Sequence, residues 1–382
     1  MIKFLFFAVL VASLNQLHCQ ANESSNSAQY WVFLGTYTSD DGSRGIYRSS
    51  FDAETGQLSA PELAMELESP SFFHIAPDGK SLYAVRENNQ EGGVYSFRLD
   101  PASGKLSDQV SLTSGGATAC HISTDNKNQF AVVSNYFGGS FAFYKLKPNG
   151  SLDSRIAHYP IPVIKIDGVD REARGHCGFF DATGTLAFTC DAGQDKVHIY
   201  KVDREKGTVT QNDPPYLAMP ALSAPRHIHI APDNKVAFVN GERDMTVNVV
   251  KLDVAANRFE VIQSLSTLRE SEKVEPGYST AECRIHPNGK FVYVSNRGHN
   301  TIAAFQYDAA TMKLSPAGHI TGDINIPRNF NITPCGKWML IASQDGGKVG
   351  VYKIDEATGL AQETTNSIKI DRCICIKFLP KP

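Results

Sequence analysis

One pattern of strand and turn residues recurs six times along this chain of 382 residues. In each unit a short β-rich segment leads into a turn of the Pro-Asp-Gly kind, which is followed by an apolar strand that ends in polar residues. The first turn residues, spaced by 47, 58, 50, 55 and 47 residues, are taken as Pro77, Thr124, Ala182, Pro232, Pro287 and Pro334. A period near 50 made of short strands and turns predicts a β-propeller whose blades are four-stranded sheets.

The two ends of the chain together supply a seventh blade. The segments "YWVFLGTYT" from Tyr30 and "GIYRSSFDAETGQL" from Gly45 have the pattern of a second and a third strand that lack a first strand. The segment "IKIDRCICIKFLP" from Ile368 matches that missing first strand. A ring closed by strands from both termini removes exposed sheet edges. We therefore expect an all-β, seven-bladed propeller over residues 30–382, without a helix of any length.

The first 21 residues have a different character. Lys3 precedes an apolar run over residues 4–14, and polar and small residues follow, which is the order typical of a secretory signal. The apolar run is too short to span a bilayer. We expect a signal peptide over residues 1–21, a flexible tether over residues 22–29 and an exported protein, periplasmic or secreted. A lipid anchor on Cys19 is the alternative, although His18 before it fits such a site poorly.

Composition limits the partners. The 37 Lys and Arg residues nearly balance the 40 Asp and Glu residues, and no basic run of the kind that binds nucleic acid is present. We expect no transmembrane segment, no cofactor and a monomer. Apart from Cys19, seven cysteines remain without zinc-ligand spacing, so we expect mostly small core residues and at least one free thiol.

Polar residues recur where the propeller repeat would place them at one channel mouth. The first strand of each blade lines the channel and the second returns antiparallel, so the start of one and the end of the other share a mouth. Six residues before the turns stand Ser71, Thr118, His176, Arg226, Ala281 and Arg328. One residue further along stand Cys177, His227, Glu282 and Asn329. At the end of the returning strand, nine to eleven residues past the turn, stand Glu87, Asn135, Asp191, Glu242, Arg297 and Gln344.

This set has two interpretations. One is an anion-binding pocket with acid–base groups, and the other is a structural ring of charges that holds the blades together. A third slot, three residues before the turn, carries His74, His121, His229 and Arg284, and a histidine there is typical of a hydrogen-bonded strand residue rather than of a metal ligand. Arginines at the rim disfavour a metal site, and the zinc-protease, serine-hydrolase and phosphate-loop motifs are missing from the sequence.

Once the units are aligned, the chain resembles the seven-bladed propeller lactonases, which include the bacterial propeller-type 6-phosphogluconolactonase and the fungal 3-carboxy-cis,cis-muconate lactonizing enzyme. The resemblance runs from about Val32 to Phe378. It rests on "GTYTS", "SNYFGGS", "GHCGFFDATG", "DAGQDKVHIY", "APRHIHIAPDNK", "VNGERDMTVNV", "AECRIHPNGKFVYVSNRGHNTIAAF" and "PRNFNITPCGKW".

The resemblance implies site residues at the channel mouth. It assigns catalytic roles to His176, Arg226, Glu242 and Arg297. With the slots above, it makes substrate-binding candidates of Asp191, His227, Glu282, Arg284, Arg328 and Glu87. The chain departs from the family's Pro-His-Ala-His motif, because Arg174 replaces the first histidine, and Cys177 stands where a serine is common. These departures bear on the substrate more than on the fold.

The implied reaction is metal-independent hydrolysis of a lactone. His176, titrating near neutrality, would take a proton from water, with Asp191 or Glu242 orienting it. Arg226 and Arg297 would bind the anionic group and the oxyanion. An exported enzyme would rarely meet a phosphorylated sugar lactone, so we expect another sugar-acid or carboxylated lactone as the substrate. A lactonizing cycloisomerase and a non-catalytic ligand- or partner-binding propeller are the alternatives.

Overall fold

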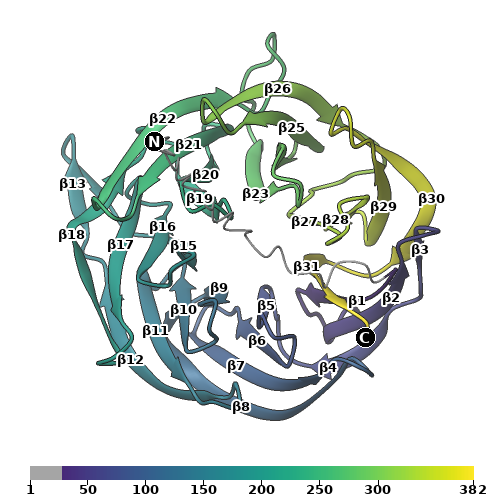
Figure 1. Ribbon diagram of the computed structural model, residues 1–382, viewed down its shortest axis with the longest axis horizontal. Helices are drawn as coiled ribbons and strands as arrows, with labels where there is room; N and C mark the ends of the chain where they lie inside the picture. Colours follow the sequence, from purple (N-terminus) through teal and green to yellow (C-terminus); the bar gives the residue numbers. More distant parts are fainter. Residues whose placement is uncertain (1–27) are drawn as a thin grey trace, which may run out of the picture.

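Seven β-sheets stand around a common axis and form a closed ring (Figure 1). This computed structural model describes residues 28–382, so the predicted signal peptide, Cys19 and most of the predicted tether lie outside the described residues. The first strand begins at Gln29, the last residue of that tether. Residues 28–382 contain no helix, and hence none that is long and apolar enough to cross a membrane. The predicted all-β propeller is confirmed.

The two inner strands of each blade position the channel. The innermost strands are β5 (Phe73–Ile75), β9 (Ala119–Thr124), β15 (Gly175–Phe180), β19 (Pro225–Ile230), β23 (Ser279–Ile285), β27 (Asn329–Ile332) and β31 (Cys373–Pro380). Their antiparallel partners are β6 (Ser81–Arg86), β10 (Phe130–Asn135), β16 (Leu186–Asp191), β20 (Val236–Gly241), β24 (Phe291–Arg297), β28 (Trp338–Ser343) and β1 (Gln29–Thr36).

The outer half of each blade covers this inner ring. The third strands are β7 (Glu91–Asp100), β11 (Ser140–Leu146), β17 (Lys196–Asp203), β21 (Thr246–Asp253), β25 (Thr301–Asp308), β29 (Lys348–Ile354) and β2 (Gly45–Asp52). The edge strands are β8 (Lys105–Ala117), β12 (Leu152–Pro160), β18 (Thr208–Ala218), β22 (Arg258–Ser266), β26 (Lys313–Ile320), β30 (Ala361–Lys369) and, in the blade of both termini, β3 (Gln57–Leu58) and β4 (Glu62–Glu66).

The ring closes as the sequence predicts. β31 from the C-terminal end pairs antiparallel with β1 from the N-terminal end, in a register that runs from Tyr30 opposite Pro380 to Thr36 opposite Cys373. β31 therefore supplies the innermost strand of the closing blade, so that β1 is paired on both sides. Trp338 ties the closing blade to the blade before it, because its indole N–H donates a hydrogen bond of 2.8 Å to the carbonyl of Ala53 in the closing blade.

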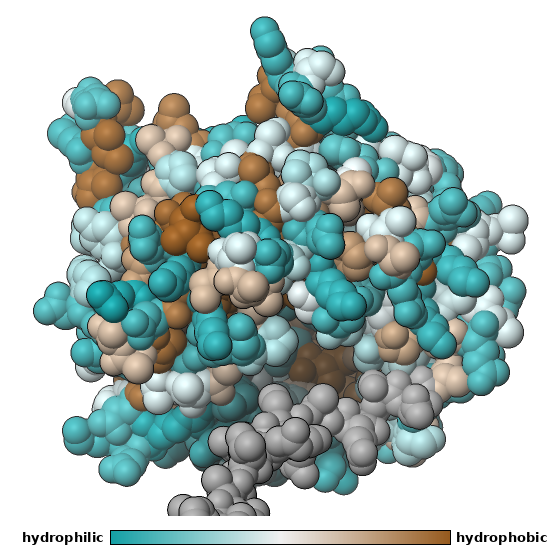
Figure 2. Space-filling model, turned by 45° about the horizontal axis from the view of Figure 1, so that its top comes forward, coloured by the Kyte–Doolittle hydropathy of each residue, from teal (hydrophilic) through white to brown (hydrophobic). Residues whose placement is uncertain are grey.

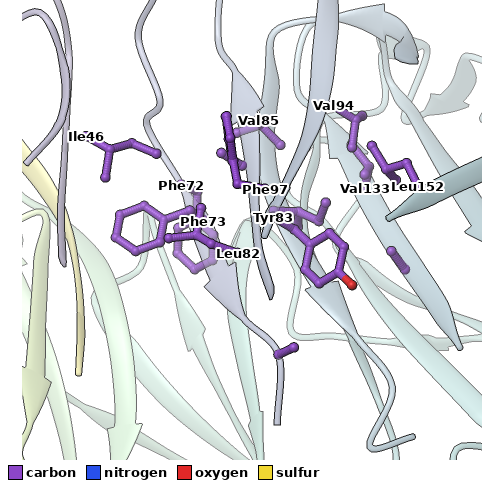
Figure 3. Packing of buried hydrophobic residues seen from close by; sticks show 14 of the residues in the cluster. Ile46, Phe72, Phe73, Leu82, Tyr83, Val85, Val94, Phe97, Val133 and Leu152 are labelled. Atoms are coloured by element: carbon purple, nitrogen blue, oxygen red, sulfur yellow. The ribbon is translucent and has the colours of Figure 1, made fainter. Parts of the chain in front are cut away.

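The hydrophobic core lies between neighbouring blades, where the faces of adjacent sheets pack together. Figure 3 shows one such layer, in which side chains of β5, β6 and β7 meet side chains of the next blade. Tyr83 is fully buried there, and its hydroxyl donates to the carbonyl of Gly150 in a turn of the neighbouring blade, at 2.5 Å. Tyr293 repeats this contact with Gly359 at 2.8 Å. These tyrosines bury an apolar ring and still satisfy the hydroxyl.

The cysteines of the described residues are all free, and six of the seven are buried. Cys335 is the half-buried exception. This agrees with the expectation that most of them fill the core as small apolar residues.

Two segments project from the ring (Figure 2). One is the hairpin of β13 (Ile164–Ile166) and β14 (Val169–Arg171), and the other is the connection from β22 to β23. Each joins an edge strand to the start of the next innermost strand, so both segments lie on the side of the predicted mouth. They expose large apolar side chains, with Val169 63% exposed and Val274 49% exposed.

Candidate active site at the channel mouth

The turns of the repeat fix which residues are equivalent between blades, and one predicted equivalence is wrong. In the unit of β5 and β6 the turn is closed by a hydrogen bond from Gly79 N to Ala76 O. The matching bond in the next unit runs from Asn128 N to Asp125 O. The turn of that unit therefore begins at Asn126, two residues later than Thr124. Cys120, not Thr118, therefore stands six residues before the turn, at the channel mouth. His121 no longer stands three residues before the turn, where the sequence pattern placed it.

The same count places the mouth position of each returning strand ten residues past the first turn residue, at the last residue of β24 and one residue after the other strands. The side chains at that position belong to Glu87, Tyr136, Ala192, Glu242, Arg297 and Gln344, and β1 contributes Tyr37 by the register of Phe33 opposite Lys377. Asn135 and Asp191, which the sequence placed in this slot, lie one residue short of it. The sequence does not single out Tyr37 and Tyr136, because the turn before β10 begins two residues later than its pattern indicates and the N-terminal blade carries no turn to count from.

Asp191 is engaged within its own blade. One carboxylate oxygen accepts hydrogen bonds from the backbone N–H groups of Arg174 at 2.8 Å and Gly193 at 3.0 Å. The other lies 3.3 Å from His198 Nε2. The carboxylate is fully buried, and within residues 28–382 it makes no hydrogen bond to His176. Asp191 thus shapes the turn that precedes His176 and does not orient its ring.

Glu242 joins two arginines at the mouth. Its Oε1 accepts a hydrogen bond of 2.5 Å from Arg297 Nη2, and its Oε2 lies 3.7 Å from Arg226 Nε. Backbone carbonyls fix the same guanidinium groups, since Arg226 donates to Ala281 O at 2.6 Å and Arg297 donates to Thr280 O at 3.0 Å. The structure therefore brings Arg226, Glu242 and Arg297 together, as expected. The two guanidinium groups outweigh the effect of burial and lower the pKa of Glu242 below 4.5.

Arg328 is a half-buried cation of the mouth that lacks an ion-pair partner in the part of the chain that the structure describes. Among the described residues its guanidinium has no hydrogen bond or ion pair, and its ring contact is with Tyr37, at 5.6 Å from the ring centroid. The hydroxyl of Tyr37 in turn donates to Glu87 Oε1 at 2.9 Å. Burial works against the charge of Arg328, but Tyr37, Glu87 and Glu242 raise its pKa. The three guanidinium groups and two carboxylates named here leave one positive charge in excess, to which Arg372 adds a further guanidinium group, 5.2 Å from the centroid of the Tyr37 ring.

His176 lies among aromatic rings rather than among hydrogen-bonding groups. Its ring centroid is 5.5 Å from that of Tyr136 and 5.4 Å from that of His227. Its Nδ1 is buried and has no hydrogen-bond partner among the described residues, whereas its Nε2 is not buried in the same manner. Burial, followed by the charge of Arg226, lowers the pKa of His176 well below 6.5. The expectation that it titrates near neutrality is therefore wrong, and the ring is neutral at physiological pH.

A buried layer beneath the mouth connects Arg226 to the lower channel. Arg226 Nη1 lies 3.2 Å from His227 Nε2, and His227 Nδ1 lies 3.1 Å from Glu282 Oε1. Arginine can only donate, so Nε2 accepts and the Nδ1–H donates to Glu282. Glu282 also accepts from Arg284 Nη2 at 3.4 Å and from Asn329 Nδ2. His227 and Glu282 stand one residue further along their strands than the mouth position, so they support the mouth from below, and both are as deeply buried as Arg226.

Metal ligands do not gather in the part of the chain that the structure describes. Among residues 28–382, groups of three or more His, Cys, Asp or Glu side chains that could hold a metal ion are not found. The carboxylates at the mouth are engaged instead by arginine and tyrosine.

Comparison with known proteins agrees with this architecture. The chain matches the family described as Lactonase, 7-bladed beta-propeller, over residues 31–378. It is 27% identical to the 6-phosphogluconolactonase of Bacillus subtilis, a match that covers 92% of this chain and 99% of that protein. It is also 27% identical to the 6-phosphogluconolactonase of Formosa agariphila, over 89% of this chain and 97% of that protein.

A solved structure shows the same fold. The periplasmic gluconolactonase of Pseudomonas aeruginosa superposes with a TM-score of 0.86 at 24% identity, covering 93% of this chain and 100% of that one. The family match covers almost all of the described residues and includes every residue of the mouth named above. The chain therefore belongs to the lactonase family of seven-bladed β-propellers.

Proposed function

We propose that the protein hydrolyses a sugar-acid or carboxylated lactone at the channel mouth, without a metal ion. The observation that carries this proposal is the convergence of a neutral histidine, His176, with the unpaired guanidinium group of Arg328 and the pair of Arg226 and Arg297. These groups match the needs of the reaction, which are a proton acceptor and stabilisation of negative charge.

The excess positive charge supports an anionic substrate. Arg226 and Arg297 are held by Glu242 and by backbone carbonyls, so they are preorganised and lose little freedom when they bind. Arg328 has no such partner among the described residues, which leaves its donors for the carboxylate or phosphate of a ligand. We assign Arg328 to the anionic group of the substrate, and Arg226 and Arg297 to the oxygen of the lactone carbonyl.

His176 has the right form to accept a proton. Its neutral ring can receive the proton of a water molecule at Nε2 as the water oxygen attacks the lactone carbonyl carbon. The tetrahedral oxyanion that forms is stabilised by the guanidinium groups. When the ring C–O bond breaks, the histidine returns the proton to the leaving oxygen. The product is the open hydroxy acid, and the enzyme is restored.

Two lines of support bear on the substrate. The named relatives act on a phosphorylated sugar lactone by their names, and the arginines of this mouth would suit a phosphate as well as a carboxylate. The expected signal peptide argues for export, where phosphorylated sugar lactones are scarce. We therefore propose an exported enzyme of carbohydrate metabolism that prefers a non-phosphorylated sugar-acid or carboxylated lactone, and that acts as a monomer.

A lactone panel tests the proposal. Hydrolysis releases acid, so a weakly buffered pH indicator reports it, and each lactone is run with wild type, with His176→Ala and without enzyme. We expect saturable hydrolysis of at least one anionic lactone, unchanged by a chelator and lost in His176→Ala. Hydrolysis that stops with the chelator would refute the metal-independent mechanism. Ring closure of an unsaturated acid without lactone hydrolysis would favour the cycloisomerase, and tight binding without turnover would favour the binding propeller.

A further inference from the structure

A second set of side chains lines the channel below the mouth, three residues further along each innermost strand. Three residues of a strand span about 10 Å, so this set lies about 10 Å deeper than the mouth. Every blade contributes one residue at the equivalent position, and we call this set the lower ring. Its members are His74, Ser123, Phe179, His229, Arg284, Asn331 and Lys377.

A buried layer separates the lower ring from the mouth. His121 and Cys177 are fully buried, and His227, Glu282 and Asn329 are at most 4% exposed. The side chains of the lower ring are half-buried again, with the exception of Ser123. A half-buried ring behind a buried layer must reach solvent through the other opening of the channel. The lower ring is therefore separate from the candidate active site.

Lys377 is a cation without a directly paired carboxylate in residues 28–382. Its Nζ lies 4.4 Å from the centroid of the Phe72 ring, and within the described residues it makes no hydrogen bond or ion pair. A cation–π contact compensates only part of the cost of removing an ammonium group from water. Burial, followed by repulsion from Arg284, lowers the pKa of Lys377 to about 8, so the amine remains mostly charged at neutral pH.

The other charges of the lower ring do not neutralise it. Arg284 is paired with Glu282, but Glu282 also accepts from His227 and Asn329, and the Nε of Arg284 is buried without a partner. Burial lowers the pKa of His74 to about 3 and that of His229 to about 4, so both are neutral. Burial also lowers the pKa of His121 in the layer above. The carboxylate of Glu282 thus faces two cations, Arg284 and Lys377.

We propose that the lower ring binds a small oxyanion between Lys377 and Arg284. His74 and His229 both lie within electrostatic range of these two cations, and the neutral ring of His74 can donate one N–H to the anion, whereas the ring of His229 is hydrogen-bonded to the backbone of Cys283. His74 Nε2 is buried and unpartnered, which is what a missing ligand would leave. Sulfate, phosphate and a small carboxylate share the chemistry required, which is several strong acceptor oxygens with negative charge. The inference does not depend on the proposed reaction, because none of these residues lies at the mouth.

Isothermal titration with sulfate tests this site, because sulfate keeps its charge throughout the range in which Lys377 titrates. Wild type is compared with Lys377→Met and Lys377→Arg at constant ionic strength and neutral pH. Lys353→Met is the matched control, since the Nζ of Lys353 also lies over an aromatic ring, 5.9 Å from the centroid of Trp338, on the outside of a blade. Phosphate and gluconate are titrated in parallel to determine which oxyanion binds most tightly.

We expect Lys377→Met to lose one bound sulfate or to weaken that binding step about tenfold or more, because a hydrogen bond to a charged group is removed. Lys377→Arg and Lys353→Met keep that step. Lys377→Met is expected to fold, since it removes an unpaired cation from a half-buried site. If it does not, Lys377→Gln supplies the uncharged side chain. A sulfate isotherm that is the same for Lys377→Met, or its Gln counterpart, and Lys353→Met would overturn the proposal.

Discussion

Arg297 Nη2 lies 2.5 Å from Glu242 Oε1, and the other oxygen of the same carboxylate lies 3.7 Å from Arg226 Nε. Arg226 and Glu242 come from one blade and Arg297 from the next, so a single carboxylate sets the positions of two cations across a blade boundary. Burial and repulsion from Arg226 lower the pKa of Arg297 to about 10. The carboxylate of Glu242 compensates the repulsion between these two neighbouring guanidinium groups at the channel mouth.

Glu242→Gln removes this negative charge with little change of shape. The two arginines then repel each other without compensation, and we expect kcat/KM to fall roughly 10- to 100-fold because their geometry loosens. Initial rates at several lactone concentrations measure the effect. The matched control is Glu62→Gln. It breaks the ion pair between Arg48 on β2 and Glu62 on the edge strand β4, whose atoms lie 3.0 Å apart. Equal rates for the two variants would contradict the role given to Glu242.

His176→Ala removes the proposed base. We expect turnover to fall about 10²- to 10⁴-fold, the usual contribution of a positioned acid–base group. The circular dichroism spectrum and the melting temperature should stay close to those of wild type, because the side chain makes ring contacts but no hydrogen bond within residues 28–382. His158→Ala, on the edge strand β12, serves as the control and should keep full activity. Turnover at the wild-type level in His176→Ala would remove His176 from the mechanism.

The pH dependence of turnover follows from the shifted pKa values. The pKa of His176 lies well below 6.5 because of burial and the nearby arginines, so its basic form is already complete on the acid side of neutrality. We therefore expect kcat/KM to be flat through the neutral range and to fall only towards pH 10, where Arg297 loses its proton. Spontaneous hydrolysis is subtracted at each pH. A rise of one log unit per pH unit that levels off near 6.5 would show that the base is an ordinary histidine.

Stability should fall on acidification through the buried histidines. Burial lowers the pKa of His227 to about 4, while the unfolded chain titrates near 6.5. Between these values the unfolded state binds the extra proton, so the free energy of unfolding decreases as the pH falls from 6.5 to 4. The loss from His227 alone is roughly 3 kcal/mol, because each unit of pKa difference corresponds to about 1.4 kcal/mol.

His227→Gln tests this effect, since the amide can replace both hydrogen bonds of the imidazole. Urea denaturation measures the free energy of unfolding on the alkaline side of 6.5, where the difference between variant and wild type is constant, and again near pH 4. We expect the acid-induced loss to be smaller in the variant. A loss of the same size in both proteins would mean that His227 is protonated in the folded state.

Much of the fold could be predicted from the turn residues alone. The six turns fixed six blades, and the strand patterns at both termini fixed the seventh, because a propeller repeat is local and each unit carries its own turn and strands. The turn pattern alone does not define which residues are equivalent between blades. "STDNKN" offers turn-forming residues at several positions, and only the hydrogen bond from Asn128 to Asp125 shows where the turn begins.

Site residues could be predicted where counting from the turn residues was sufficient to place them. Contacts that depend on the direction of a side chain could not be predicted. Arg226, Glu242 and Arg297 follow from their slots and from the resemblance to lactonases. Tyr136 would have followed from the corrected turn, ten residues past Asn126. The sequence could not predict that Arg328 contacts the ring of Tyr37 and lacks an ion-pair partner among the described residues. Tyr37 belongs to the closing blade, in which no turn precedes β1 to give its position by counting. The contact of Lys377 with Phe72 likewise joins segments far apart in the sequence, strand β31 and the residue just before β5.

The most direct test of the proposed reaction is the initial rate of hydrolysis of the best anionic lactone by wild type, His176→Ala and Arg328→Met, measured side by side. We expect saturable hydrolysis by wild type and a rate in His176→Ala reduced about 10²-fold or more. We also expect Arg328→Met mainly to raise KM, because this guanidinium binds the anionic group. Failure of wild type to exceed the spontaneous rate with any anionic lactone, or rates unaffected by both substitutions, would contradict the proposed reaction.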